Sequence, residues 1–300
     1  MKFKYRRYYL YYLGRVAFFV IGFFPYSVGM YIASKLGAIS YYILGRYRRT
    51  TLENLTFAFG NEKTAGEIHA IARKVFENLG RNAFELIQFY RITKRNIDSI
   101  VRIRNLEILD GELAKGKGVI VVTAHFGNWE LMPATIIIKG YIGSVVGPRI
   151  YFHKYDKLLN RLRRLHNVNI IYRDESPRKI LKVLKANGII GIVADQDVDS
   201  VEGIFVDFFG REAYTPMGPV ALAKVSGSSL IPAFMLRKGS RHELVIEKPI
   251  ELIDTGNKEE DVVENTRRWS AVIERYVRAY PDQWVWMHRR WKTKKAKIEK

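Results

Sequence analysis

The segment VIVVTAHFGNWEL, residues 119–131, constrains the fold of this chain more than any other. Its first four residues are apolar, and a short run rich in β-branched residues is typical of a buried strand. His125 follows the predicted strand. A helix is predicted from about Trp129, with Asn128 as its N-cap and Glu130 in its first turn. Because α/β folds bind ligands where strands end, this junction is the first candidate for a functional site.

Strand and helix patterns alternate along residues 118–250. Helices are predicted over 129–139 and 154–166 and after the Ser176-Pro177 and Thr215-Pro216 pairs. Further strands are predicted at Tyr141–Val146, Val168–Tyr172, Ile189–Ala194, Ser229–Leu236 and Glu243–Glu247. This alternation predicts an α/β sandwich with a largely parallel central sheet. A dinucleotide fold is not indicated, because no G-x-G-x-x-G motif follows a strand and no phosphate loop occurs.

The spacing of His125 and Glu130 suits a general base and a carboxylate that orients it. A neutral imidazole accepts a proton near pH 7, and a carboxylate on its other nitrogen fixes the tautomer. The chain has no cysteine and no G-x-S-x-G motif. We therefore expect the nucleophile to be a substrate hydroxyl, deprotonated by His125 as it attacks a carbonyl, with turn N–H groups as an oxyanion site. The alternative is a structural histidine beside a helix-capping glutamate.

The N-terminal region is apolar and basic at its edges. No charge occurs over residues 16–34, and a second uncharged run covers residues 36–45. About 20 apolar residues span a bilayer as a helix, so residues 1–50 are predicted to be a membrane region. Pro25, Gly22 and Gly29 interrupt the run, which leaves an interfacial helix pair and a soluble core helix as alternatives.

The charge balance indicates an anionic partner. Lys and Arg number 50 against 30 Asp and Glu, a net charge of +20. Such a surplus fits nucleic acid, an anionic membrane surface, or an acidic or phosphorylated substrate. The absence of cysteine excludes disulfides and thiolate metal sites.

Three further stretches carry candidate residues. Arg161 and Arg163 belong to a basic run in the second predicted helix. Asp195-Gln196-Asp197 follows a predicted strand; a D-x-D pair can bind a divalent metal, but no third ligand of obvious spacing joins it, so no metal is predicted. Residues 84–90 form an aromatic cluster that belongs to the core or, alternatively, lines an acyl groove.

Several of these motifs resemble one family. HFGNWE resembles the His-x4-Asp/Glu motif of the glycerolipid acyltransferase superfamily, and its Gly-Asn-Trp-Glu resembles the lipid A late acyltransferases in particular. The run W-x-W-x-H-R-R-W at residues 284–291 is similar to the C-terminal motif of the same family. The F-P-E-G-T-R block of the phospholipid-making branch is missing, which favours the lipid A branch.

The resemblance implies an acyltransferase-type αβ sandwich behind an N-terminal membrane helix region. We expect an anchor over 1–50 and an acyltransferase domain over 51–300, divided into helical lead-in 51–117, catalytic core 118–250 and C-terminal helix and tail 251–300. It implies His125 as general base and Glu130 as its orienting partner. Arg161 lies where the family carries a required arginine, and Arg163 is the alternative if the register shifts. The residues expected to bind substrate are Asn128, Arg161, Arg163, Asp195, Asp197 and Thr215.

The function implied is transfer of a fatty acyl chain to a hydroxyl of a lipid A precursor, at the cytoplasmic face of the inner membrane. The donor would be acyl carrier protein or acyl-coenzyme A, and the acceptor an anionic lipid. No cofactor, no acyl-enzyme and no nucleic acid partner are expected, and the protein is expected to be a monomer. The alternatives are another acceptor (a phosphatidylinositol mannoside, a lysophospholipid or an amino-acid lipid) and a non-catalytic, basic membrane-surface protein.

Overall fold

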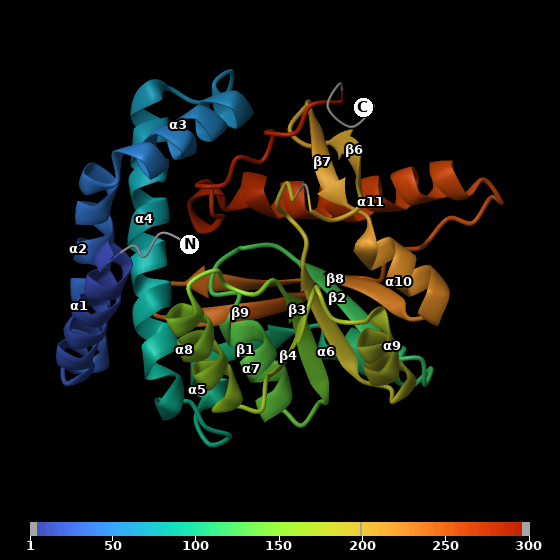
Figure 1. Cartoon of the computed structure of the whole chain (residues 1–300), viewed down its shortest axis with the longest axis horizontal. Helices are drawn as coiled ribbons and strands as arrows, with labels where there is room; N and C mark the ends of the chain where they lie inside the picture. The colour runs from blue at the N-terminus through green and yellow to red at the C-terminus, as the bar shows by residue number, and fades with distance from the viewer. Residues whose placement is uncertain (1–4, 199, 296–300) are drawn as a thin grey trace.

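The computed structural model describes residues 5–198 and 200–295, and in this part of the chain a seven-stranded sheet forms the centre (Figure 1). The strand order is β1-β9-β8-β2-β5-β3-β4, and every neighbouring pair is parallel except the β8–β9 hairpin. The strands are β1 (Val101–Arg104), β2 (Val119–Thr123), β3 (Gly143–Gly147), β4 (Asn169–Tyr172), β5 (Ile189–Val193), β8 (Ser229–Lys238) and β9 (Arg241–Ile246). The predicted α/β fold with a largely parallel sheet is therefore confirmed.

The two faces of the sheet are covered by different helices because strand side chains alternate in direction. Ile120, Val122 and Phe234 belong to one core cluster, together with residues of α9 (Pro177–Lys185), α10 (Gly218–Ser226) and α11 (Lys258–Ala279). Val119 and Met235 belong to a second cluster, together with residues of α5 (Ile97–Ile100), α6 (Leu106–Leu113) and α7 (Leu131–Ile138). The strands β2 and β8 are thus buried on both sides, as their nearly continuous apolar sequences require.

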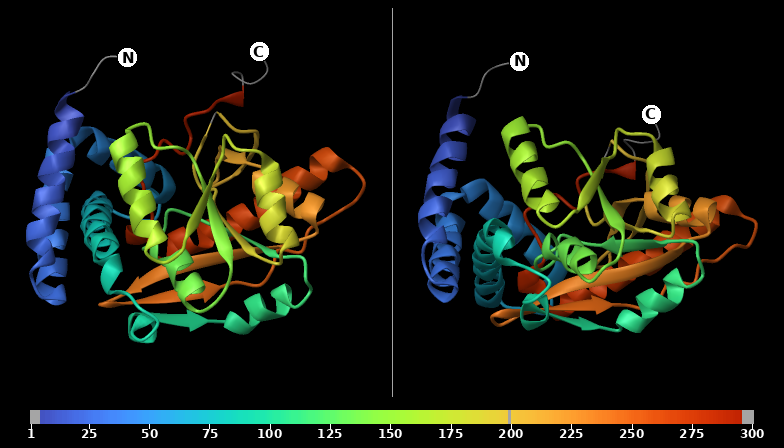
Figure 2. Two further views of the ribbon diagram at one scale, coloured as in Figure 1. Left: turned by 60° about the horizontal axis from the view of Figure 1, so that its bottom comes forward. Right: turned by 90° about the horizontal axis from the view of Figure 1, so that it is seen from below.

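The N-terminal helices form a group beside the sheet, and α8 (His153–Arg164) contacts it through aromatic rings (Figures 1 and 2). They are α1 (Tyr5–Gly22), α2 (Tyr26–Ile43), α3 (Gly45–Phe59) and α4 (Ala65–Ile87). A capping box starts α4: the Thr64 side chain accepts from the backbone of Glu67, whose carboxylate accepts from the backbone of Thr64.

The predicted membrane helix is not supported by this structure. The uncharged run of residues 16–34 is divided between α1 and α2 by a turn that contains Pro25, so neither helix carries all of it. Among the described helices, none combines the length and the hydropathy of a membrane-crossing segment. Residues 1–4 of the predicted anchor lie outside the described residues.

One predicted helix start is wrong. Thr215 and Pro216 end a strand, β7 (Glu212–Pro216), that pairs with β6 (Gly203–Asp207) in a hairpin separate from the main sheet. The following helix, α10, begins at Gly218 and has Pro219 in its first turn. A proline at a strand end removes no ladder bond that the hairpin needs, which is why the Thr-Pro pair suits this position too.

The helices α2 and α4 cross at two glycines. A Cβ atom on Gly80 would lie 2.2 Å from the Ala33 carbonyl oxygen, and one on Gly37 would lie 2.3 Å from the Phe76 carbonyl oxygen. Both contacts are with backbone, which cannot rotate away as a side chain can. The close approach of the two helices therefore requires glycine at both positions.

We expect Gly80→Ala to lower the free energy of unfolding by about 1–3 kcal/mol, because the added methyl group forces α2 away from α4. Urea denaturation of purified protein measures this. The matched control is Gly111→Ala in α6, where a Cβ atom meets nothing within 4 Å; there we expect no loss, or a gain of up to about 1 kcal/mol from helix propensity. Equal effects of the two changes would contradict the proposed crossing.

Candidate active site

The loop after β2 is fixed by backbone hydrogen bonds to the C-terminal segment. The Val285 N–H donates to the His125 carbonyl oxygen at 3.1 Å, and the Gly127 N–H donates to the Gln283 carbonyl oxygen at 2.9 Å. Gly127 has a φ of +53°, and a Cβ atom there would lie 1.7 Å from the Met235 carbonyl oxygen. Only glycine fits this turn, in both conformation and space. The loop is thus held against β8 and the residue 283–285 segment at once.

His125 is bonded to Asp195, which follows the neighbouring strand β5. The parallel register aligns Thr123 with Val193, so the residues two places further on reach the same edge of the sheet. The His125 Nδ1–H donates to Asp195 Oδ1 at 2.8 Å, and the His125 backbone N–H donates to Oδ2 at 3.0 Å. The Trp284 indole N–H donates to Oδ2 at 2.7 Å.

The protonation of this pair follows from its surroundings. Burial raises the pKa of the Asp195 carboxyl, but the hydrogen bonds and charge of His125 outweigh it and hold that pKa well below its usual range. Asp195 is therefore an anion and accepts from Nδ1–H. That tautomer leaves Nε2 as the basic nitrogen of His125, whose side chain is 24% exposed.

The orienting role expected of Glu130 is corrected by this geometry: the carboxylate on the His125 ring is that of Asp195. Glu130 lies beyond the turn, where Arg163 donates to both of its oxygens, from Nη2 at 2.6 Å and from Nε at 2.8 Å. This two-point pair is largely buried. Arg163, in the last turn of α8, is thus the arginine brought to the loop, whereas Arg161 is exposed.

The helix α7 starts at Leu131, and the Asn128 side chain accepts from the backbone N–H of that residue.

The other predicted substrate-binding residues have partners inside the protein. Asp197 accepts from the backbone N–H of Thr293 at 2.8 Å and from its hydroxyl. Thr215 is fully buried and its hydroxyl accepts from Arg290 at 2.6 Å. These bonds fasten the C-terminal segment to β5 and β7. Whether either residue touches substrate stays a prediction, but the D-x-D pair diverges and does not converge on one metal.

Two residues that the sequence reasoning did not select belong to the site. The Gln196 amide donates to His288 Nε2 at 2.7 Å, and the His288 ring centroid lies 5.2 Å from that of His125. The same amide nitrogen lies 3.1 Å from His125 Nδ1 and 3.3 Å from Nε2, and with the proton on Nδ1 only Nε2 has a lone pair to accept from it. The signal for His288 was its place in the W-x-W-x-H-R-R-W run, where only the tryptophans and arginines were weighed.

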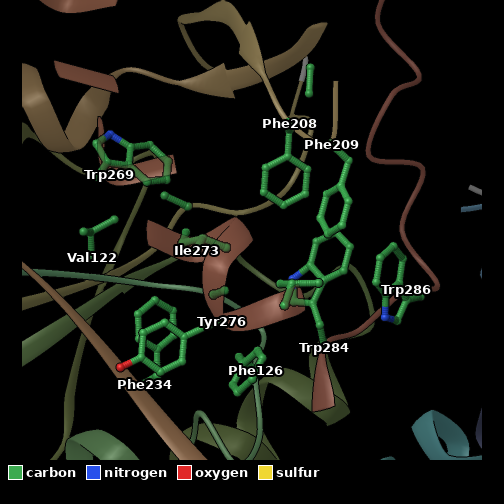
Figure 3. Packing of buried hydrophobic residues seen from close by; sticks show 14 of the residues in the cluster. Val122, Phe126, Phe208, Phe209, Phe234, Trp269, Ile273, Tyr276, Trp284 and Trp286 are labelled. Carbon is green, nitrogen blue, oxygen red and sulfur yellow. The ribbon is translucent and has the colours of Figure 1, made fainter. Parts of the chain in front are cut away.

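The tryptophans of that run belong to an aromatic core under the loop. Trp284 and Trp286 meet edge to face with centroids 4.6 Å apart, and Phe208 and Phe209 pack beside them (Figure 3). Figure 3 also shows Phe126 of the loop near the ring of Tyr276. Burial of these large rings holds the C-terminal segment in place, and with it the hydrogen bonds that shape the His125 loop.

An apolar cavity begins beside the loop that carries His125. The Trp129 ring, 5.2 Å from the His125 ring by centroids, lines it together with Glu130 and Arg163. Its deeper wall is formed by aliphatic side chains and glycines of α7, β2, β3 and β5, among them Val121, Ile136, Gly143, Val145, Ile189 and Gly191. We call it the β2–β3 cavity. The alternative acyl groove along residues 84–90 is not supported, since Phe84 and Phe89 are each only 1% exposed, as core residues are.

The pKa of His288 gives the fold a testable pH dependence. Burial and the charge of His125 together lower this pKa to about 4, although the negative charge of Asp195 acts in the opposite direction. An unfolded chain would have it near 6.5, so the unfolded state binds more protons and the free energy of unfolding falls as the pH drops. We expect His288 to account for a loss of about 2 kcal/mol between pH 7 and pH 5.

His288→Gln removes the titrating group and keeps an acceptor for Gln196. Urea denaturation at both pH values should show that this variant loses about 2 kcal/mol less than the wild type. An equal loss in both proteins would mean that His288 is not buried in its neutral form.

Comparison with known proteins identifies the family. The family model of bacterial lipid A biosynthesis acyltransferases matches residues 1–293. A lipid A biosynthesis lauroyltransferase of Escherichia coli K12 is 25% identical over 295 residues, which cover 96% of this chain and 93% of the relative.

Two other relatives differ in what they are named for. A lipid A biosynthesis palmitoleoyltransferase of Escherichia coli K12 is 24% identical and covers 98% of this chain and 94% of its own. A phosphatidylinositol mannoside acyltransferase of Mycobacterium tuberculosis H37Rv is 23% identical over 209 residues, covering 67% of this chain and 63% of its own. The match over nearly the whole chain, together with the HFGNWE loop, shows that this protein is an acyltransferase of the bacterial lipid A biosynthesis acyltransferase family.

Proposed function

We propose that the protein transfers a fatty acyl chain from acyl carrier protein to a hydroxyl of a lipid A precursor at a membrane surface. One observation carries this proposal: the His125 ring, bonded to Asp195, lies against the ring of Trp129, which lines an apolar cavity together with the Glu130–Arg163 pair. A base next to a slot for an alkyl chain is what acyl transfer to an alcohol requires.

The reaction uses His125 twice. Its Nε2 takes the proton of the acceptor hydroxyl while that oxygen attacks the thioester carbonyl carbon, and the carbonyl oxygen becomes an oxyanion. When the tetrahedral intermediate collapses, the C–S bond breaks, and the imidazolium returns the proton to the departing thiolate. The products are an ester and a free thiol. Asp195 stabilises the imidazolium between the two steps, as a buried carboxylate does in hydrolase triads.

Arg163 supports the same transition state. Its Nε and Nη2 donate to Glu130, which fixes the plane of the guanidinium at the cavity mouth. The remaining Nη1 then faces the developing oxyanion or a phosphate of the donor. Glu130 accordingly acts as the residue that positions Arg163, in place of the direct role on His125 that its spacing suggested.

The N-terminal helices provide the membrane contact. Large apolar side chains on α1, α2 and the turn between them are strongly exposed, including Leu13, Phe19, Phe23, Tyr31 and Ile43 at 63–74%. Exposed apolar surface of this extent is typical of an interaction face. The net charge of +20 favours an anionic membrane and an acidic carrier protein.

A phosphatidylinositol mannoside, or another hydroxylated lipid, is the second candidate acceptor. The same chemistry serves each of these alcohols, and one relative is named for acylating such a mannoside. The assay that tests the function therefore offers both classes of acceptor.

We expect His125→Ala to lower kcat for acyl transfer by about a thousandfold or more, and Asp195→Asn by about a hundredfold or more, because the base is lost or held in the wrong tautomer. The measurement is transfer of a labelled acyl chain from acyl carrier protein to a tetra-acylated lipid A precursor. The matched control is His153→Ala, since His153 is an exposed histidine of α8. Full activity of His125→Ala would contradict the mechanism. If the wild-type protein transfers the acyl chain only to other lipids, the acceptor is the second candidate and not a lipid A precursor.

The β2–β3 cavity should set the length of the transferred chain. Gly191 lines it, and a Cβ atom there would lie 3.5 Å from the Val145 side chain and 3.9 Å from the Ser144 carbonyl oxygen, both ordinary contacts. We expect Gly191→Val to reduce kcat/KM for a myristoyl donor at least tenfold relative to a decanoyl donor, since each methylene excluded costs about 0.8 kcal/mol. Gly147→Val on β3, with a similar 3.5 Å contact to Ile170, is the control. An unchanged preference in Gly191→Val would show that the chain binds elsewhere.

A further inference from the structure

A second cavity of about 350 Å³ lies beside the N-terminal helices and reaches the start of α7, where Leu131 lines it. Its walls come from the end of α4, the start of α2, the segment around α5 and the β8–β9 turn. The polar residues that matter are Gln88, Arg91, Ser99, Ser240, Arg241 and His242. We call it the Gln88 cavity.

Glu85 lines this cavity but is already saturated. Its carboxylate accepts from Arg237 at 2.7 and 2.6 Å, from His242 Nε2 at 2.9 Å, from the Tyr26 hydroxyl at 3.0 Å and from the Asn128 amide at 2.8 Å. Burial raises the pKa of Glu85, but these partners outweigh it and hold that pKa well below its usual range. A carboxylate has room for about four hydrogen bonds, so Glu85 has nothing left to offer a ligand.

Gln88 and His242 are different, because they keep unused hydrogen-bonding atoms. Gln88 is 3% exposed, and both its Oε1 and its Nε2 lack a partner in the described part of the chain. His242 is 2% exposed and its Nδ1 also lacks one. Since His242 Nε2–H donates to the Glu85 carboxylate, Nδ1 is the ring nitrogen left to bond a ligand. Native proteins leave few such groups unpaired, so a cavity lined by two of them indicates a polar occupant.

The rim of the cavity adds positive charge. Arg91 and Arg241 are exposed there, and Ser99 and Ser240 line the same cavity. Arg91 already donates from Nε to the Tyr90 hydroxyl and from Nη2 to the Gly22 carbonyl oxygen, so only part of its guanidinium is open to a ligand. Guanidinium groups bind phosphate oxygens by paired, charge-assisted hydrogen bonds. The site therefore combines a buried amide and a buried imidazole nitrogen with two arginines at its rim. Hydroxyl groups can both donate to and accept from such groups.

We propose that the Gln88 cavity binds a phosphorylated sugar, with its hydroxyls on Gln88 and His242 and its phosphate on Arg91 and Arg241. The volume lies in the range of small-molecule sites. The sugar phosphate is either a free metabolite or the headgroup of a lipid. In the second case it belongs to the acceptor lipid, and this assignment rests on the proposed function. Glu85 joins the cavity to the active-site loop through Asn128, three residues after His125.

The binding experiment uses full-length purified protein and glucosamine 1-phosphate, with glucosamine and inorganic phosphate as partial probes, in isothermal titration calorimetry. We expect the sugar phosphate to bind more tightly than either part. Gln88→Met, similar in size, should weaken binding at least tenfold while raising the melting temperature of the ligand-free protein, because it removes an unpaired buried amide. Arg241→Gln should also weaken binding at least tenfold. Arg102→Gln, an exposed arginine of β1 outside the cavity, is the charge-matched control and should bind as the wild type does.

Vesicles separate the two sources. We compare vesicles that contain a phosphorylated glycolipid with vesicles of equal charge that lack it. If the wild-type protein binds the first kind more tightly and Gln88→Met loses this difference, the ligand of the cavity is a lipid headgroup. Binding of soluble sugar phosphate without that difference assigns it to a free metabolite. No binding of glucosamine 1-phosphate together with equal binding to both kinds of vesicle overturns the proposal. His125→Ala should bind normally here, so failure of the acyl-transfer mechanism and failure of this site are observed separately.

Discussion

The rest of the site depends on one carboxylate, that of Asp195. It accepts from the ring and the backbone of His125 and from the indole of Trp284, so three separate segments of the chain meet at two oxygens. The carboxylate is fully buried, and such a charge is tolerated only when it is bonded this completely. Its bonds fix the tautomer of His125, the shape of the loop and the path of the C-terminal segment together.

The loop that carries His125 borders two cavities of opposite character. On one side the β2–β3 cavity is apolar, and the Glu130–Arg163 pair forms part of its lining. On the other side the Gln88 cavity is polar and is joined to the loop through Glu85 and Asn128. Each of the two glutamates is neutralised by an arginine that donates from two nitrogens. The loop is thus supported on both sides by ion pairs that leave its histidine accessible.

Sequence patterns were reliable where burial and local chemistry act alone. The apolar runs predicted six of the seven strands of the main sheet, all except β1, to within a few residues, and Ser176 caps its helix as its hydroxyl predicts. They failed at Thr215-Pro216, because the pair suits both a helix start and a strand end, and pairing with β6 decided between them. The run of residues 16–34 is as long and uncharged as a membrane span, yet the turn at Pro25 divides it into two helices. Spacing also favoured Glu130 as the partner of His125, when the carboxylate that reaches the ring comes from a neighbouring strand.

The sequence by itself determined the fold class and the family, because strand periodicity and the HFGNWE motif are local properties of the chain. Only the tertiary structure decided which side chains form hydrogen bonds with one another in the site. Asp195 reaches His125 because two parallel strands end in register, and Arg163 instead of Arg161 reaches Glu130 because the last turn of α8 presents it to the loop. Gln88 and Glu85 lie three residues apart on the chain. The surrounding elements provide hydrogen-bond partners for the Glu85 carboxylate but none for the Gln88 amide. Hydrogen bonds between distant residues depend on packing, which no local pattern records.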